Sequence, residues 1–245
     1  MNEIKVSVIT VSYNSSKTIK RTIESVLHQT YDNIEYIIVD GASTDGTVDI
    51  VKSYEAVFNA KLKWVSESDE GIYYAMNKGI RMATGELVGI INSDDWYEPD
   101  AIAKVVKAYG GEKYQILYGK MRTWSGNTEK GVFWKSHETL EEGMIAHPTC
   151  FVSKAVYDDI GMYDTVYRSV ADYDFMLRMH HDDRVIFKSI DEIIANFTTG
   201  GMSSTGEAWL ELLRMQKRYN LISTWQYNKF MFKDRVYRLF HEKKN

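Results

Sequence analysis

The chain of 245 residues lacks the features of secreted, disulfide-bonded and membrane-spanning proteins. Its single cysteine, Cys150, excludes a disulfide within the chain and favours a reducing compartment. No segment approaches the roughly 18 apolar residues of a spanning helix. The apolar run at 6–11 is short and follows the mixed charges of Glu3 and Lys5, unlike a secretory signal. We therefore expect a globular, cytoplasmic protein.

A basic stripe along the main part of the chain is also absent, which argues against a general nucleic-acid binder. The net charge is −4, yet residues 209–245 alone carry +6, which leaves −10 for residues 1–208. Many aromatic side chains lie within this basic segment. Aromatic and basic side chains together suit the interfacial layer of a membrane, so the segment is a candidate for membrane contact.

No Gly-rich phosphate loop follows the first apolar run. Residues 10–14 (TVSYN) lack the G-x-G-x-x-G pattern that a dinucleotide-binding dehydrogenase needs there. They also lack the Gly-, Arg- and Lys-containing loop expected of a nucleotidyltransferase that makes nucleotide sugars. The absence argues against both classes. The nucleotidyltransferase is kept as an alternative, as is a protein that binds nucleotide sugars without catalysis.

The first hundred residues alternate between apolar runs and helical patterns. We expect strands at 5–12, 36–40, 62–66 and 87–91, with helices after residue 16, after residue 46 and at 71–82. Repeated strand–helix–strand connections are right-handed and place the strands in parallel. The pattern predicts an α/β fold with a mostly parallel central sheet and helices on both faces.

The second half, past Pro99, is mixed rather than alternating. We expect helices at 100–108, 154–160 and 172–181, a strand at 116–120, a hairpin at 123–133 that turns at 125–127, and short strands at 185–190 and 193–197. This half is predicted to complete a cleft. The one module boundary that we expect lies near Glu207, where the basic aromatic segment begins.

Acidic residues follow two of the expected strands. Asp40 ends the second strand, and Asp94 with Asp95 follows the fourth. Ligands of open parallel sheets bind beyond the carboxyl ends of the strands. Carboxylates there attract a hard divalent cation, which in turn holds a diphosphate. Together with Asp172 and Asp174, they predict a metal-dependent enzyme that acts on a nucleotide diphosphate.

Short motifs along the chain resemble those of family 2 glycosyltransferases, which have a GT-A fold, and in particular the members that build bacterial polysaccharides. The motifs are VSVITVSYN (6–14), SVLHQTY (25–31), DGASTDGT (40–47), DEGIYYAMNKG (69–79), NSDD (92–95), HPT (147–149), ADYD (171–174) and GGMS (200–203). The resemblance implies a GT-A-like domain at 1–206, with a nucleotide-binding half at 1–100 and an acceptor-side half at 101–206, before a helical tail at 207–245.

The same resemblance implies transfer of a sugar, with inversion, from a nucleoside diphosphate sugar to an acceptor hydroxyl. We expect a UDP-sugar as the donor, Mn²⁺ or Mg²⁺ as the cofactor, and a saccharide as the acceptor. The expected acceptor is linked to polyprenyl diphosphate and serves cell-surface polysaccharide synthesis at the inner face of the cytoplasmic membrane. We expect no nucleic-acid partner. The oligomeric state stays open, and a homo-oligomer is compatible with the sequence.

Individual roles also follow from the resemblance. Asp172 matches the general base that takes the proton of the acceptor hydroxyl. Asp94 and Asp95 match the metal motif, but Asn92 replaces its first acid, so which aspartate binds the metal directly stays open. The implied donor contacts are Val11, Tyr13, Asp40, Asn77, Lys78 and Asp94, with Asp40 on the nucleobase edge and Tyr13 stacked on the base. The implied acceptor or lid contacts are His147, Gly200, Gly201 and Ser203.

Most of these positions have a structural interpretation as well. Asp40 can cap the turn before the next helix, and Asp94 with Asp95 can lie at a helix N-terminus. Asp172 can cap its own helix, and His147 can be a structural histidine whose partners lie within the protein. These alternatives predict side chains that are already bonded to the chain.

The tail is predicted to contain an amphipathic basic helix. Phe232, Val236, Leu239 and Phe240 recur at helical spacing, and basic residues lie on the other faces. Such a stripe suits peripheral docking on a membrane. Packing on the core of the protein or on a second subunit explains it equally well.

Overall fold

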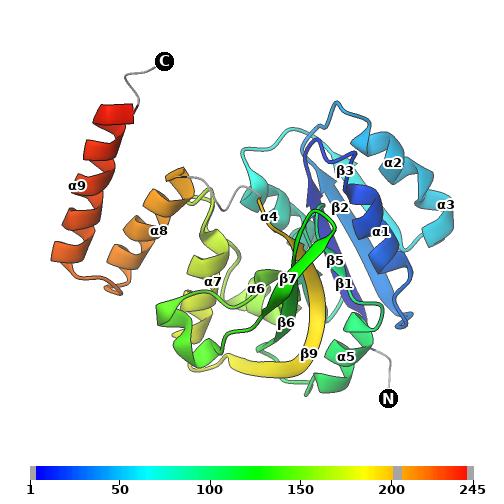
Figure 1. Ribbon diagram of the computed structural model, residues 1–245. Coiled ribbons are helices and arrows are strands. Elements are labelled where there is room, and N and C mark those ends of the chain that lie inside the picture. The colour runs from blue at the N-terminus through cyan, green and yellow to red at the C-terminus, as the bar shows by residue number, and fades with distance from the viewer. Residues whose placement is uncertain (1–3, 201–205, 242–245) are drawn as a thin grey trace.

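The computed structural model describes residues 4–200 and 206–241, and the side chains of the last helix up to residue 234 (Figure 1). Within these residues a nine-stranded sheet has the order β3-β2-β1-β4-β8-β6-β9-β5, and β7 pairs with β6. The strands are β1 (Val6–Ser12), β2 (Ile34–Asp40), β3 (Leu62–Ser66), β4 (Leu87–Ile90), β5 (Trp96–Tyr97), β6 (Gln115–Ser125), β7 (Thr128–Phe133), β8 (Phe151–Ser153) and β9 (Ile186–Thr198).

Helices flank this sheet and continue beyond it. They are α1 (Ile19–Leu27), α2 (Thr47–Ser53), α3 (Glu55–Phe58), α4 (Ile72–Met82), α5 (Ala101–Ala108), α6 (Lys154–Asp159), α7 (Ala171–His180), α8 (Gly206–Arg218) and α9 (Thr224–His241). Two 3-10 turns, η1 (His137–Glu142) and η2 (His147–Thr149), lie between β7 and β8.

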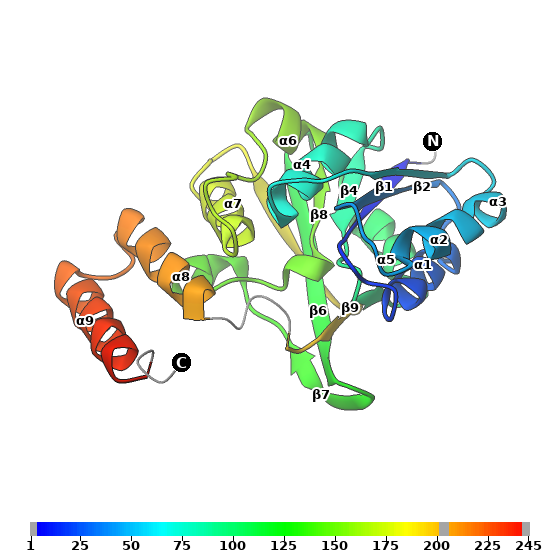
Figure 2. The same cartoon turned by 90° about the horizontal axis from the view of Figure 1, so that it is seen from above.

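The parallel part of the sheet forms as the apolar runs predict. β1 runs parallel to both β2 and β4, and β3 runs parallel to β2. Because side chains alternate between the faces of a strand, Val6 and Val8 of β1 enter one hydrophobic core while Ile9 and Val11 enter the other. Helices α1, α2 and α5 cover the first core, and α4, α6 and α7 cover the second (Figure 2). The predicted α/β class is confirmed.

Helix α4 approaches β1 very closely at Gly79. A Cβ atom at this position would lie 2.5 Å from Cγ2 of Ile9, which is closer than packed carbon atoms come. The missing side chain therefore allows the close contact. This contact fixes the distance between α4 and the sheet, and with it the position of the first turn of α4, which borders the candidate site.

The prediction of two short strands at 185–190 and 193–197 is wrong, because the segment forms one strand, β9. Asp191 and Glu192 interrupt the apolar pattern there. They lie where the register of β6 and β9 shifts, and they form ion pairs with Lys120 at 2.6 Å and Lys104 at 3.5 Å. The register shift carries these charged residues outside the regular pairing without ending the strand.

Strand β6 also joins two elements that we expected to be separate, the strand at 116–120 and the first arm of the hairpin. The expected hairpin itself is confirmed, since Ser125 pairs with Thr128 across Gly126. The sequence did not indicate β5 and β8, which have two and three residues. β8 lies antiparallel between β4 and β6 and so connects the two halves of the sheet.

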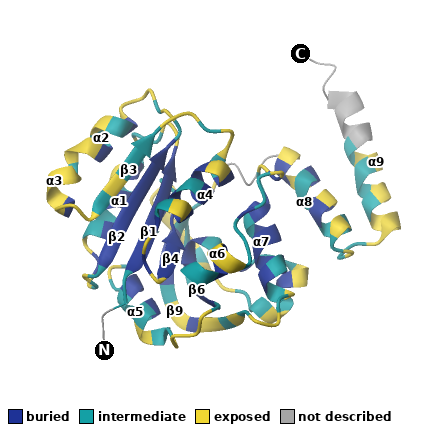
Figure 3. Cartoon of the chain, turned by 180° about the vertical axis from the view of Figure 1, so that it is seen from behind, coloured by how far each residue is buried: buried dark blue, intermediate teal, exposed yellow. Residues whose placement is uncertain are grey.

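The basic tail contains two helices. α8 buries Leu213 and Met215, and Met215 belongs to the core that α4 and α7 cover. α9 packs on α8 through an edge-to-face contact of Phe230 with Trp209 at 5.7 Å, and it extends away from the sheet (Figure 1, Figure 3). Among the helices described, none is both long and apolar enough to cross a membrane.

A buried carboxylate on β2 ties the start of the parallel sheet together. Glu35 is 2% exposed. It accepts hydrogen bonds from Ser7 Oγ (2.5 Å), Thr84 N (2.5 Å), Thr84 Oγ1 (2.9 Å) and Gly85 N (3.1 Å), and forms ion pairs with Lys63 (3.0 Å) and Lys5 (3.3 Å). Burial alone would raise its pKa, but the hydrogen bonds together outweigh burial and lower the pKa of Glu35 to about 2.

Because the pKa of Glu35 is lower in the folded protein than in the unfolded chain, the ionised carboxylate stabilises the fold at pH values above the unfolded pKa. The stabilisation is complete above about pH 4.5 and is lost as the pH falls toward about 2. Glu35→Gln is expected to lower the free energy of unfolding at pH 7 by roughly 3 kcal/mol. Urea unfolding of both proteins between pH 7 and pH 3 tests this, with the exposed Glu86→Gln as control. A difference that stays constant with pH would contradict the assignment.

Candidate active site

Asp40 lies at the carboxyl end of β2, as predicted, and is 1% exposed. Its Oδ1 accepts hydrogen bonds from Ser12 Oγ at 3.0 Å and Ser43 Oγ at 2.5 Å. Its Oδ2 accepts hydrogen bonds from Ser43 N at 2.8 Å and Ser66 Oγ at 2.7 Å. These bonds match the turn-capping alternative and hold the carboxylate rigidly. The contact with a nucleobase stays a prediction.

The loop after β1 lies beside Asp40 and carries the predicted stacking residue. The ring of Tyr13 is 68% exposed, and its Cδ2 lies 3.3 Å from the position of a Cβ on Gly41. An exposed aromatic face next to a residue without a side chain is suited to stacking on a planar ligand. Val11 is buried in the core behind this edge, so its side chain is turned away from it.

The acidic pair Asp94–Asp95 follows β4 at the same edge of the sheet. Ser93 Oγ lies 2.8 Å from Ser15 Oγ, which joins this loop to the loop after β1. Asp95 is fully buried, and its Oδ1 accepts a hydrogen bond from Thr198 N at 2.9 Å. Among the described residues, Asp95 Oδ2 and Asn92 Oδ1 are buried and have no hydrogen-bond partner.

The electrostatics of this loop disfavour two ionised acids. Burial raises the pKa of Asp95 well above its usual range, and the charge of Asp94 raises it further. Burial also raises the pKa of Asp94. The positive charge of Arg21, a residue of α1, lowers the pKa of both acids and so offsets part of the effect of burial. Its guanidinium lies 3.5 Å above the ring of Trp96 and donates a hydrogen bond to the carbonyl oxygen of Asp94 at 2.7 Å. A bound cation would favour the ionised forms of both acids.

The residues of this loop fit a hard divalent cation. Asp94, the free oxygen of Asp95 and Asn92 offer only oxygen atoms, which Mg²⁺ and Mn²⁺ prefer. In the part of the chain that the structure describes, no group of three or more His, Cys, Asp or Glu side chains forms a metal site. Mg²⁺ usually takes one or two carboxylates and completes its coordination with water and substrate phosphates. The loop therefore matches a cation that is held jointly with a diphosphate.

Asp172 is the second residue of α7 and is partly exposed. Its Oδ1 accepts two hydrogen bonds, from Tyr73 OH at 2.9 Å and from Tyr173 N at 2.9 Å. The described residues donate no hydrogen bond to its Oδ2. The neighbouring acid differs, because Asp174 is buried and forms an ion pair with Arg178 at 2.9 Å.

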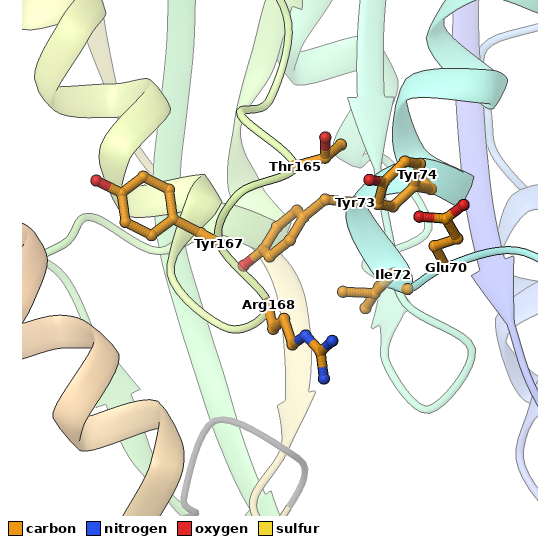
Figure 4. A pocket seen from close by; sticks show the side chains of 8 residues that line it. Glu70, Ile72, Tyr73, Tyr74, Thr165, Tyr167 and Arg168 are labelled. Carbon is orange, nitrogen blue, oxygen red and sulfur yellow. The ribbon is translucent and has the colours of Figure 1, made fainter.

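A pocket of about 320 Å³ lies between the first turn of α4 and the loop that precedes α7. It is lined by Glu70, Gly71, Ile72, Tyr73, Tyr74, Thr165, Tyr167 and Arg168 (Figure 4). Figure 4 shows the ring of Tyr73 reaching from α4 toward the segment of Tyr167 and Arg168. Tyr73 also donates a hydrogen bond to Asp172, so one residue that lines the pocket contacts the predicted general base.

Two predicted donor contacts on α4 are bonded within the chain. Asn77 is 5% exposed, its Nδ2 donates to the carbonyl of Tyr163 at 2.9 Å, and its Oδ1 accepts from Tyr163 N at 3.1 Å. Lys78 forms an ion pair with Glu67 at 2.7 Å. Asn77 therefore fixes the loop before α7 on α4, and the donor contacts of both residues stay predictions.

The predicted acceptor or lid residues are described only in part. His147 Nε2 lies 2.8 Å from Tyr163 OH, and burial lowers the pKa of His147 although the charge of Asp172 opposes this effect. This geometry matches the structural alternative for the histidine. Gly200 follows β9 with φ of +106°. Gly201 and Ser203 lie outside the described residues.

Sequence reasoning missed several residues that hold the site. Tyr73 and Tyr163 bond Asp172 and Asn77 across long sequence separations. Arg21 and Thr198 bond the backbone of Asp94 and the side chain of Asp95 from α1 and β9. The only signal for Tyr73 was its place within the motif at 69–79, and the motifs contain neither Arg21 nor Thr198.

Comparison with known proteins identifies the family of the chain. The family model "Glycosyl transferase family 2" matches residues 7–160. A PGL/p-HBAD biosynthesis glycosyltransferase of Mycobacterium bovis (strain BCG / Pasteur 1173P2) is 29% identical over 220 residues, which cover 88% of this chain and 86% of that protein. An uncharacterized glycosyltransferase of Mycobacterium tuberculosis (strain CDC 1551 / Oshkosh) is 34% identical over 180 residues, which cover 71% and 68% of the two chains.

Solved structures share the fold. S. aureus TarS 1-349 in complex with UDP-GlcNAc superposes with a TM-score of 0.71 at 23% identity, over 87% of this chain and 65% of the TarS chain. The mannosyltransferase PcManGT from Pyrobaculum calidifontis, in complex with GDP-Man and Mn²⁺, has a TM-score of 0.66 at 18% identity, over 91% of this chain and 66% of that chain.

The family match extends from β1 through α6 and so includes the acidic edge of the sheet, and the matched structures share the α/β architecture around it. The chain therefore belongs to glycosyl transferase family 2 and is a glycosyltransferase.

Proposed function

We propose that the protein transfers a hexosyl group, with inversion, from a UDP-sugar to a hydroxyl of a saccharide acceptor, with Mn²⁺ or Mg²⁺ at Asp94 and Asp95. The observation that carries the proposal is the environment of Asp172. One of its oxygens is held by two donors, while the other receives no hydrogen bond from the described residues. One of the two donors, Tyr73, lines a pocket of about 320 Å³. Such a carboxylate is suited to accept a proton from a bound hydroxyl.

The proposed reaction is a single displacement. The acceptor oxygen forms a bond to the anomeric carbon while its proton moves to Oδ2 of Asp172. The bond between that carbon and the diphosphate breaks, and its electron pair leaves with the nucleotide. Attack from the face opposite the leaving group inverts the anomeric centre. The pocket between α4 and the loop before α7 is the proposed acceptor site, because Tyr73 both lines it and bonds the carboxylate that takes the proton.

The leaving diphosphate carries growing negative charge in this reaction. A divalent cation supplies charge stabilisation for such a leaving group. Asp94 and Asp95 would hold it, with Asn92 as a further oxygen donor. Thr198 and Arg21 keep the loop in place through their contacts with Asp95 and Asp94.

The comparisons support the choice of donor class. TarS was solved with UDP-GlcNAc and PcManGT with GDP-Man and Mn²⁺, so both structures bind a nucleoside diphosphate sugar on this fold. We propose a uridine nucleotide, because the small uracil ring suits a base that bonds Asp40 and stacks on Tyr13. A guanosine nucleotide is the alternative. The proposed acceptor is a saccharide linked to polyprenyl diphosphate in cell-surface polysaccharide synthesis.

Asp172→Asn is expected to reduce sugar transfer by about 10²- to 10⁴-fold, because an amide cannot take the acceptor proton. Donor binding is expected to persist, since Asp172 does not lie at the donor edge. The measurement is nucleotide release with acceptor present, together with calorimetric titration of the donor. The exposed Asp158→Asn is the control. Undiminished turnover of the Asp172 variant would contradict the proposal.

Asp95→Asn is expected to abolish the metal-dependent part of donor binding and to lower transfer by roughly 10²-fold or more. The readout is the thermal shift produced by UDP-sugars with and without Mn²⁺, because a ligand stabilises the fold in proportion to its affinity. Removal of the metal with EDTA should have the same effect on the unchanged protein. The control is the exposed Asp49→Asn. A donor-induced shift that is identical with and without Mn²⁺ would exclude the metal.

The tail supports a lipid-linked acceptor. On α9, Trp225 and Phe232 are 69% and 68% exposed, and Lys229 Nζ lies 4.8 Å above the ring of Trp225. Phe230 occupies a different face and packs on Trp209 of α8. The exposed face therefore combines aromatic and basic side chains on a helix that extends away from the sheet (Figure 3). We propose that it docks peripherally on an anionic membrane.

Charge favours a membrane over a second copy of this chain. Residues 224–241 contain four Lys or Arg and one Asp, so a pair of such faces would bring like charges together. Anionic lipid headgroups offer the complementary charge. Within the tail, α8 is the helix that packs on the core, where its Met215 is fully buried.

Trp225→Ser combined with Phe232→Ser is expected to release the protein from vesicles of phosphatidylglycerol, because both exposed rings are lost. Cosedimentation should fall several-fold, and phosphatidylcholine vesicles should bind little of either protein. Val132→Ser combined with Phe133→Ser removes exposed apolar residues from β7 and serves as the control. Unchanged sedimentation would exclude the membrane contact, and a dimer lost in the tail variant would indicate self-association instead.

A further inference from the structure

The hydroxyl of Tyr73 connects the two halves of the chain at the candidate base. It donates to Oδ1 of Asp172 at 2.9 Å from a position 99 residues earlier in the sequence. The same oxygen also accepts from Tyr173 N at 2.9 Å. With two donors on one oxygen, rotation of the carboxylate would break both bonds. The geometry therefore distinguishes the two oxygens of Asp172.

Tyr73 is itself held in place. It is 6% exposed, and its ring packs against Tyr163 with a centroid distance of 5.7 Å. Its helix is fixed to β1 by the close contact at Gly79, and to the loop before α7 by the two hydrogen bonds of Asn77. A donor with so little freedom loses little entropy when it bonds the carboxylate.

Tyr73 is also a permanent donor. Burial raises its pKa well above the usual value of a tyrosine, and the charges of Asp172 and Glu211 raise it further. The hydroxyl therefore keeps its proton at neutral pH, and it does not compete for the acceptor proton.

We propose that Tyr73 is a positioning residue, which holds Oδ1 of Asp172 so that Oδ2 faces the acceptor hydroxyl. The inference rests on the proposed role of Asp172 as the general base. In the transfer step the proton of the acceptor moves to Oδ2, and Tyr73 gives up no proton. Its effect acts entirely through the orientation of the carboxylate.

The test removes the hydroxyl with Tyr73→Phe. Loss of one hydrogen bond to the base is expected to lower kcat for transfer by roughly five- to tenfold, while the KM for the donor and the melting temperature stay close to those of the unchanged protein. Tyr114→Phe is the matched control, because Tyr114 OH makes an equivalent bond to Asp159 Oδ2 at 2.9 Å on the surface, away from the pocket.

A double-mutant cycle separates positioning from general structural support. In the Asp172→Asn background, Tyr73→Phe is expected to have no further effect on the residual rate, because the carboxylate it orients is gone. A further five- to tenfold loss in that background would overturn the inference. So would an unchanged kcat of the single Tyr73→Phe variant.

A second variant tests the same idea if Tyr73→Phe does not fold. It carries 3,5-difluorotyrosine in place of Tyr73, which keeps the ring and the hydroxyl but loses its proton at lower pH. The charged groups acting on this hydroxyl are Asp172 of α7 and Glu211 of α8. Transfer is expected to be retained at pH 6. As the pH rises, transfer should begin to fall at a lower pH than it does in the unchanged protein, because the phenolate that forms cannot donate a hydrogen bond. An unshifted profile would overturn the inference.

The two proposals fail separately. Full activity of Asp172→Asn would remove the general base and with it the proposed mechanism. Impaired Asp172→Asn together with normal Tyr73→Phe would leave the mechanism in place and reject only the positioning role.

Discussion

The paired hydrogen bonds between Asn77 and the backbone of Tyr163 hold the two halves of the chain together at the candidate site. Both polar groups of the amide are used, and the site is buried, so separating the halves would leave unsatisfied donors and acceptors. Gly79 sets α4 against β1, and Asn77 then sets the loop before α7 against α4. The position of Asp172 relative to the sheet edge therefore depends on two residues that take no part in the proposed chemistry.

The buried acids at the sheet edge differ in how completely the protein satisfies them. Asp40 accepts four hydrogen bonds, whereas Asp95 accepts one and keeps a buried oxygen without a partner among the described residues. A buried charge without partners is costly, so the environment of Asp95 favours the protonated form when no cation is bound. The unsatisfied oxygen is thus better explained by a ligand than by stability. This contrast favours Asp95, rather than Asp40, as a residue whose state changes on binding.

Much of the fold could be predicted because the parallel strands are continuous apolar runs, and the acids that follow them mark the edge of the sheet where ligands are expected. Local pattern did not reveal β9, because Asp191 and Glu192 look like a break until Lys120 and Lys104 are seen to pair with them. At the site, the sequence predicted which acidic residues follow the strands, but it did not predict which residues would form hydrogen bonds with them. The hydrogen bond of Tyr73 with Asp172 links distant segments that only the tertiary fold brings together.

The hydrogen bonds of Asp40 also constrain how it would recognise a base. A nucleobase N–H can bond this carboxylate only by sharing or replacing one of the present donors. Ser12 and Ser66 lie within strands whose pairing fixes them opposite Asp40. Ser43 lies in the loop after β2, where its hydroxyl donates to Asp40 and accepts from the backbone N of Asn14 at 2.7 Å, so it can turn its proton to solvent and still keep the bond from Asn14. Exchange of the Ser43 hydroxyl for a base N–H replaces one hydrogen bond by another, at a net cost of only about 1 kcal/mol. A buried, fully bonded carboxylate is therefore compatible with base recognition, provided that the flexible partner is the one displaced.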